Sequence, residues 1–215
     1  MTYKLFVRPE AKGLKGLILL GSGNDESDPG TGSLDGVLEN AVAAALAKLG
    51  YGAAIVAYRD QPAVDFKDGG TSWNRNTGML TADMSAVADT IIAAQGGGLN
   101  RSRVLTGGVS YTSYALLTNI AMNDSPLADT RGVLAACGAT GDYEAKNFRV
   151  PVFSLNCAGN PEGDFSGQAL YDRITNAKLK ADSGFFVDPA CNSHCGGDNG
   201  TWTSKLVERA QLWLP

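Results

Sequence analysis

The sequence predicts an α/β fold in which a mostly parallel β-sheet carries helices on both faces. Short apolar runs, many of them β-branched, alternate with longer segments of helical periodicity along the whole chain. Strands that are apolar throughout are typical of parallel strands buried on both faces. Neither an internal repeat nor a low-complexity linker interrupts this order, so residues 1–215 are expected to form one domain.

The first half of the chain supplies four of the predicted strands. These strands are residues 3–8, 16–21, 52–59 and 103–108. The helices predicted between and after them are residues 34–49, 81–95 and 111–122. Residues 3–8 alternate between apolar and polar side chains, which indicates an edge strand. Gly50 is a common helix stop directly after residues 34–49, and a long loop is predicted over residues 60–80.

The second half continues the alternation to the C-terminus. Its predicted strands are residues 131–137, 150–157 and 184–188, and its predicted helices are residues 167–176 and 201–214. The last helix is amphipathic, because Trp202, Leu206 and Trp213 fall on one stripe.

Charge and composition exclude several classes of function. The net charge is −4 and the isoelectric point is about 5.0, so neither nucleic acid nor an anionic membrane is an expected partner. No apolar run approaches the roughly 20 residues of a membrane span. Only 19% of residues are charged, and 27 are glycine, which suits a compact secreted or periplasmic protein. No signal-peptide pattern is visible, so that location requires a signal already removed; a cytoplasmic location is the alternative.

The most informative stretch is residues 103–121, where a short strand leads through Gly107 and Gly108 to Ser110 and then directly into a helix. This strand–turn–helix layout is the nucleophile elbow, a sharp turn that exposes a serine hydroxyl. The residues two before and two after the serine must be small, and here they are Gly108 and Thr112. The usual G-x-S-x-G pattern has glycine in the last place, so Thr112 is a mild departure.

A serine hydroxyl is a weak nucleophile and needs a neighbouring base. The chain contains a single histidine, His194, which is therefore the expected base for Ser110. Two structural alternatives compete with this interpretation. A serine at the start of a helix commonly caps that helix, and His194 would then be an ordinary loop residue.

Three segments together resemble the α/β-hydrolase fold of serine esterases: the GGVSYT elbow, the GSGN loop after GLILL, and the NSHCGG loop before the last helix. The resemblance implies a single-domain hydrolase, without cofactor or metal, whose serine attacks an ester carbonyl. It also implies that two backbone N–H groups hold the oxyanion. One belongs to Tyr111, and the other to Gly23 or Asn24.

The cysteine spacing resembles that of bacterial cutinase-like polyester hydrolases. Those enzymes place one cysteine three residues before the triad acid and a second just past the histidine. Here Cys157 lies three residues before Asn160, and Cys195 directly follows His194. The spacing therefore puts an asparagine where the resemblance expects the carboxylate.

The acid of the triad is expected elsewhere in the same loop. An asparagine can orient an imidazole but stabilises an imidazolium far less than a carboxylate does. We therefore expect Asp164 to be the acid, with Glu162 next and the Asn160 position as a further alternative. Asp142, after the preceding strand, is a more distant candidate.

The four cysteines allow two disulfides. The resemblance to polyester hydrolases implies a Cys157–Cys195 bridge. Cys137 would then pair with Cys191 or stay free. The competing set joins Cys137 to Cys157 across neighbouring strands and Cys191 to Cys195 within one loop. Zinc bound by Cys191, His194 and Cys195, or free thiols, are further alternatives.

The site is expected to be open, because no insertion is long enough for a lid domain. Its expected partner is a small-molecule or polymeric ester, and the protein is expected to be a monomer. Trp73 and Tyr111 are the first candidates for substrate-binding walls, followed by Tyr58 and Tyr143. Each of these aromatic residues could equally fill the core.

Two alternative functions stay open. One is a hydrolase-fold protein that binds without turnover, which Asn160 and the unsettled acid motivate. The other keeps the fold but hydrolyses amides, thioesters or lactones. Dinucleotide binding is disfavoured, because Glu26 stands where the GSGNDE loop would need its third glycine and acidic residues repel phosphate.

Overall fold

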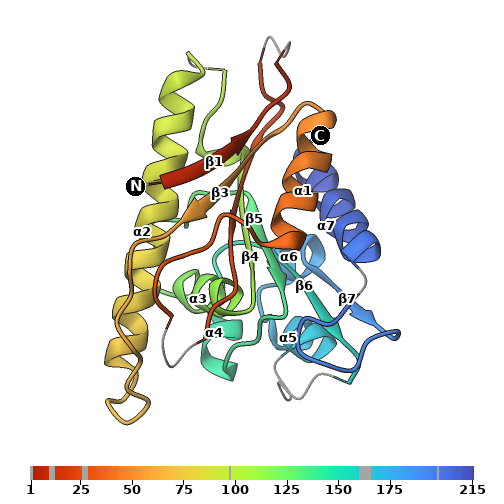
Figure 1. The fold of residues 1–215 in the computed structure, drawn as a ribbon. Coiled ribbons are helices and arrows are strands. Elements are labelled where there is room, and N and C mark those ends of the chain that lie inside the picture. The colour runs from red at the N-terminus through yellow and green to blue at the C-terminus, as the bar shows by residue number, and fades with distance from the viewer. Residues whose placement is uncertain (1, 10–12, 26–28, 97, 160–165, 198) are drawn as a thin grey trace.

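A seven-stranded sheet organises the protein in the computed structural model, which describes residues 2–9, 13–25, 29–96, 98–159, 166–197 and 199–215. Its strands are β1 (Thr2–Phe6), β2 (Leu17–Gly21), β3 (Gly52–Ala57), β4 (Val104–Val109), β5 (Gly132–Ala136), β6 (Val152–Cys157) and β7 (Gly184–Asp188). They lie in the order β1-β3-β2-β4-β5-β6-β7 (Figure 1). Only β1 is antiparallel to its neighbour, so the predicted mostly parallel sheet is confirmed.

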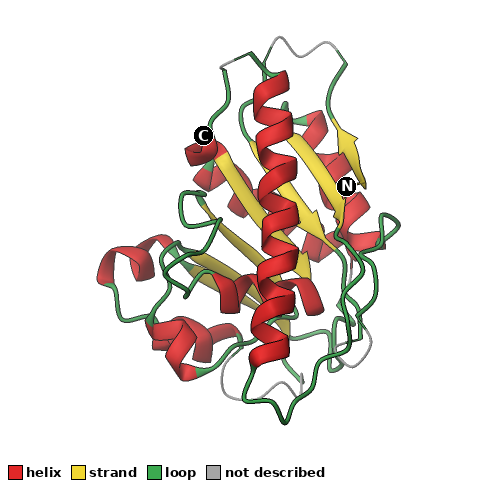
Figure 2. Ribbon diagram, turned by 90° about the vertical axis from the view of Figure 1, so that its left-hand side faces the viewer, coloured by secondary structure: helices red, strands yellow, loops and turns green. Residues whose placement is uncertain are grey.

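Helices cover both faces of this sheet, as predicted. They are α1 (Val37–Lys48), α2 (Thr71–Ala94), α3 (Tyr111–Asn119), α4 (Asp142–Lys146), α5 (Gly167–Arg173), α6 (Ala177–Asp182) and α7 (Asn199–Trp213). Side chains of α1 and α7 pack on one face, and those of α2 to α6 pack on the other. Figure 2 shows α2 running along its face of the sheet. None of the helices in the described ranges is both long and apolar enough to cross a membrane.

The alternation of side chains along each strand builds two cores at once. On β2, Leu17 and Leu19 pack with α2 and α3, whereas Ile18 and Leu20 pack with α1 and α7. All four are at most 4% exposed. Burying one such side chain contributes about 1.5–3 kcal/mol, which explains why the strand is apolar without interruption.

Helix α2 is longer than predicted and corrects the expected loop over residues 60–80. The helix begins at Thr71, although its first ten residues are mostly polar. Three of these polar side chains, Ser72, Asn76 and Thr77, are nevertheless buried. Asn76 Nδ2 donates to the carbonyl of Pro62 at 2.8 Å, so these residues tie the helix to the preceding loop. The short helices α4 and α6 were also not predicted.

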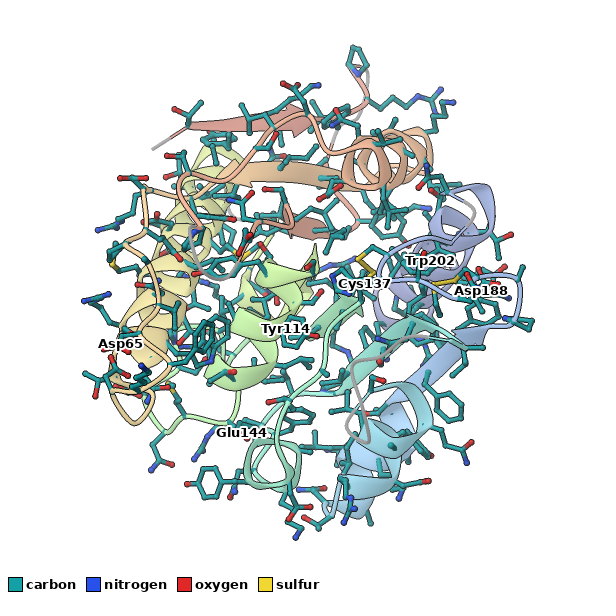
Figure 3. The ribbon with its side chains drawn as sticks, turned by 60° about the horizontal axis from the view of Figure 1, so that its bottom comes forward. Asp65, Tyr114, Cys137, Glu144, Asp188 and Trp202 are labelled. Carbon is teal, nitrogen blue, oxygen red and sulfur yellow. A yellow bond between two sulfur atoms is a disulfide. The ribbon has the colours of Figure 1, made fainter. Side chains whose placement is uncertain are left out.

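The parallel strands end along one edge of the sheet, where the unusual residues gather. Gly21 of β2 pairs with Gly108 of β4, and Cys157 of β6 pairs with Asp188 of β7. Functional groups in open parallel sheets collect at the carboxyl ends of strands. Figure 3 brings this edge forward and labels Cys137 and Asp188, which lie at the ends of β5 and β7.

Candidate active site

Ser110 occupies the sharp turn between β4 and α3. Its φ is 47° and its ψ is −117°, a conformation that costs a non-glycine residue on the order of 1–3 kcal/mol. Backbone hydrogen bonds hold the turn, because Ser110 N donates to Ala136 O at 2.9 Å and Tyr114 N donates to Ser110 O at 3.0 Å. The Ser110 side chain makes no capping hydrogen bond to α3, so the alternative of a helix-capping serine is wrong.

The hydroxyl of Ser110 contacts the one histidine of the chain. Ser110 Oγ lies 2.7 Å from His194 Nε2. The two residues come from segments far apart in sequence, so the fold must place both to produce this contact. A nucleophile within hydrogen-bond distance of a base is the geometric signature of nucleophilic catalysis.

Partial burial of the imidazole lowers the pKa of His194 from its ordinary value of 6.5. If His194 is the base expected from the sequence, it must be uncharged to accept the Ser110 proton, and activity should be lost as pH falls through its pKa. We therefore expect the acid limb of the kcat/KM profile to have its midpoint below pH 6.5. The carboxylate proposed below to orient His194 acts in the opposite direction, so a midpoint above 6.5 would show that its negative charge raises the pKa by more than burial lowers it.

Thr112, the departure from the usual elbow pattern, fits because two neighbouring glycines leave room for it. A Cβ on Gly21 would come within 2.7 Å of the Thr112 side chain, and one on Gly108 would come closer still. Thr112 Oγ1 also donates to the carbonyl of Ser22 at 2.6 Å. The extra side chain thus joins the elbow to the loop after β2.

That hydrogen bond orients the peptide between Ser22 and Gly23. This peptide is trans, so its carbonyl and its N–H point in opposite directions. Gly23 passes directly beside Ser110, since a Cβ on Gly23 would lie 3.0 Å from Ser110 Cβ. The Asn24 side chain instead donates to the carbonyls of Pro29 and Thr31 within its own loop.

The role of the Thr112 hydroxyl can be tested with two variants. Thr112→Val keeps the shape and removes the hydroxyl, which should lower kcat about tenfold with little change in KM, since a whole oxyanion donor contributes more than that. Thr112→Ser keeps the donor and should preserve kcat. Equal kcat in the two variants, both correctly folded, would mean that the hydroxyl only fills space.

The two disulfides join Cys137 to Cys195 and Cys157 to Cys191. Both pairings considered from the sequence are therefore wrong, including the Cys157–Cys195 bridge implied by cutinase-like enzymes. With all four sulfurs in disulfides, the zinc and free-thiol alternatives are wrong as well.

The loop after β7 (residues 189–197) carries His194 and is called the histidine loop here. Its path explains this connectivity. After β7 the chain runs back along the edge of the sheet, reaching first the end of β6 and then the end of β5. Cys191 is bonded to Cys157 at the first of these strand ends, and Cys195 to Cys137 at the second. The next strand in the sheet is β4, so the loop delivers His194 to Ser110.

Reduction should therefore destabilise the protein. The bridges close segments of 58 and 34 residues, and chain entropy assigns each about 4 kcal/mol of stabilisation.

We expect the double variant Cys137→Ala/Cys195→Ala to lose more hydrolytic activity than Cys157→Ala/Cys191→Ala, because only the first bridge holds the residue next to His194. An unchanged melting temperature under reduction would contradict the bridged state.

Asp188 is a buried residue that the sequence did not single out. Its carboxylate accepts a hydrogen bond from Trp202 Nε1 at 2.7 Å and from Ala190 N at 2.9 Å. It thereby fixes the start of the histidine loop against α7, near the Cys157–Cys191 bridge (Figure 3). The sequence does carry a signal for this residue, because Asp188 is a charged residue at the end of the apolar strand β7.

Comparisons with known proteins find solved structures with a similar fold. A serine hydrolase without lid from Xanthomonas campestris matches with a TM-score of 0.66 and 18% identity, over 99% of this chain and 89% of that chain. A cold-adapted esterase from an Arctic intertidal metagenomic library matches with a TM-score of 0.67 and 17% identity, over 99% and 88%. Est1E from Butyrivibrio proteoclasticus matches with a TM-score of 0.66 and 10% identity, over 98% and 93%.

The chain has the α/β-hydrolase fold. No protein-family model matches the sequence, and no curated protein matches it. The fold is therefore recognised from the elbow, the strand order and these structures rather than from sequence similarity.

The acid that the hydrolase fold would require is not placed by the structure. Asn160, Glu162 and Asp164 lie outside the described residues. Asp142 is engaged elsewhere, because it pairs with Lys146 and with Arg173 at 3.4 Å, and Lys146 lowers its pKa.

The aromatic residues expected from the sequence as substrate-binding walls separate into two groups. Tyr58 and Tyr111 are fully buried, so their side chains belong to the core and cannot contact substrate. The expected substrate-wall role of Tyr111 is therefore wrong, and its expected role as oxyanion donor needs only its backbone N–H. Trp73 is half-buried and lines a cleft, whereas Tyr143 is 72% exposed.

Proposed function

We propose that the protein is a serine hydrolase that cleaves carboxylic esters through an acyl-enzyme on Ser110. The 2.7 Å contact between Ser110 Oγ and His194 Nε2 carries this proposal. In the first step Oγ attacks the ester carbonyl while His194 takes its proton. His194 then gives that proton to the leaving alcohol, and the acyl group stays on Ser110.

Water completes the cycle. His194 accepts a proton from a water molecule as the water oxygen attacks the acyl carbonyl. The tetrahedral intermediate then releases the carboxylic acid, and the proton returns to Ser110. The N–H groups of Tyr111 and Gly23, with Asn24 as the alternative second donor, would hold the oxyanion in both halves, each contributing about 3 kcal/mol.

Asp164 is the proposed acid that orients His194, with Glu162 and the Asn160 position as alternatives. A carboxylate bonded to Nδ1 would keep the proton off Nε2, which is the atom that faces Ser110.

The proposed substrate is a bulky or polymeric ester, because His194 lies on the exposed side of the site. Hydrolysis of lactones, thioesters or amides is the alternative for the same residues. The two disulfides support a secreted or periplasmic protein, since such bonds persist in oxidising compartments. We propose that it acts as a monomer.

Covalent labelling tests the proposal most directly. A fluorophosphonate should react stoichiometrically with Ser110, located by mass mapping of the labelled peptide, and Ser110→Ala should not react. Folded wild-type protein that gives no adduct would instead favour the alternative of a binding protein without turnover.

A further inference from the structure

A cleft of about 520 Å³ opens at the carboxyl edge of the sheet, and the reaction proposed above assigns it no role. One wall is the segment from Val64 to the first turn of α2. The second wall is α3, and the third is the segment from Ala139 to α4. Neither Ser110 nor His194 lines the cleft itself, so its position relative to them decides whether a substrate could use it.

The cleft begins one helical turn from the nucleophile. Tyr114 lines it, and the Tyr114 N–H donates to the carbonyl of Ser110. Ala139 lines it two residues after Cys137, which is bonded to the neighbour of His194. In Figure 3, Tyr114 lies between Cys137 and the two acidic residues Asp65 and Glu144, which come from different walls of the cleft. The cleft is therefore next to the Ser110 turn, and a substituent of a carbonyl held at Ser110 would have to extend past Tyr114 to enter it.

Aromatic side chains form much of the lining. Phe66, Trp73 and Tyr114 contribute to it, and Phe66 is 68% exposed. Trp73 is held rigidly, because its Nε1 donates to Thr118 Oγ1 at 3.1 Å and its ring meets Tyr111 edge-on at 5.6 Å between centroids. Aromatic faces attract both apolar groups and cations.

The charges that line the cleft are negative. Asp65 and Glu144 lie on different walls, and among the described residues no lysine or arginine lines the cleft. The positive end of α2 is already occupied, since Asp68 accepts hydrogen bonds from Gly70 N at 3.0 Å and Ser72 N at 2.7 Å. An anion in this cleft would meet two carboxylates and, among the described lining residues, no cation.

We propose that this cleft is a subsite for an ammonium-bearing group of the ester substrate, held between aromatic faces and the carboxylates of Asp65 and Glu144. The proposal rests on the ester hydrolysis proposed above and narrows its substrate class. Esters with a carboxylate at the corresponding position are expected to be poor substrates.

Two series of matched esters test the preference for charge. In the alcohol series, butyrylcholine is compared with its neutral isostere 3,3-dimethylbutyl butyrate. In the acyl series, p-nitrophenyl esters of 4-(trimethylammonio)butyrate, 5,5-dimethylhexanoate and hemiglutarate are compared. In the series whose charged group enters the cleft, kcat/KM for the cation should exceed that for the neutral isostere about fivefold, as for an exposed cation–π or ion-pair contact. The preference should shrink as salt is added.

Variants locate the effect in the cleft. Glu144→Gln and Asp65→Asn should each lower the cation-to-neutral ratio of kcat/KM about two- to fivefold. The matched control, Glu208→Gln, removes an exposed carboxylate on α7 that pairs with Lys205, and it should leave the ratio unchanged.

The outcomes separate the two proposals. Hydrolysis of neutral esters without a cation preference in either series would overturn the subsite while leaving the serine hydrolase intact. A preference that survives both cleft variants would overturn the subsite as well. Failure to hydrolyse any ester, together with no fluorophosphonate adduct, would overturn both.

Discussion

Replacing Ser110 with alanine is expected to lower kcat for ester hydrolysis by about a millionfold, the loss typical of removing the nucleophile from a working catalytic unit. His194 would keep its place but would have no hydroxyl to deprotonate, so the acyl-enzyme could not form. The measurement is the initial rate with an activated ester, at an enzyme concentration high enough to detect residual turnover.

Folding should survive this substitution. The Ser110 side chain does not cap α3, and alanine tolerates the positive φ no worse than serine does. The melting temperature should therefore match that of the wild type. Ser204→Ala, at an exposed position of α7, is the matched control and should retain full activity. Substantial activity in Ser110→Ala would place the nucleophile elsewhere and end the proposal.

The buried strands were predictable because their signal is local. A strand buried on both faces must be apolar at nearly every position, as β2 is from Leu17 to Leu20. The first turns of α2 gave no such signal. Asn76 and Thr77 are both buried. Thr77 donates to the carbonyl of Asn74 within α2, but Asn76 donates to the carbonyl of Pro62, and that partner exists only once the preceding loop has folded against the helix.

The Ser110–His194 contact was predictable for a different reason. The sharp turn of the elbow admits only small residues two positions before and after the serine, so the sequence reveals it. A chain with one histidine offers only one imidazole as the base. The disulfides were not predictable in this way. Their pairing depends on the loop after β7 passing β6 before β5, which is a property of the path of the chain rather than of the cysteine spacing.

The burial of the Tyr111 side chain was likewise not predictable from the sequence. The residue after an elbow serine offers a backbone N–H whatever its side chain is, so the sequence alone could propose Tyr111 as an oxyanion donor. Its ring, however, is fully buried between Tyr58 and Trp73, and its hydroxyl donates to Gln61. Long-range packing of this kind distinguishes a core aromatic residue from a substrate wall.

Among the acidic candidates, Asp164→Ala is expected to lower kcat about 10⁴-fold, whereas Glu162→Ala should change it little. Without its carboxylate partner, His194 would no longer be held with the proton on Nδ1 and an accepting Nε2 toward Ser110. The imidazolium formed during attack would also lose a compensating charge. Rates for the two variants, with thermal melting to verify folding, decide between them.

A third variant examines the position that the cutinase-like spacing singles out. If Asp164 already serves as the acid, the carboxylate added by Asn160→Asp has no catalytic role, and the substitution should not raise kcat. A large gain in kcat from Asn160→Asp would mean that the acid position is held by an asparagine and that the natural protein works below its capacity. A loss in Glu162→Ala alone would move the acid to Glu162. Because Asp142 is already paired with Lys146, it becomes the candidate only if neither loop acid matters.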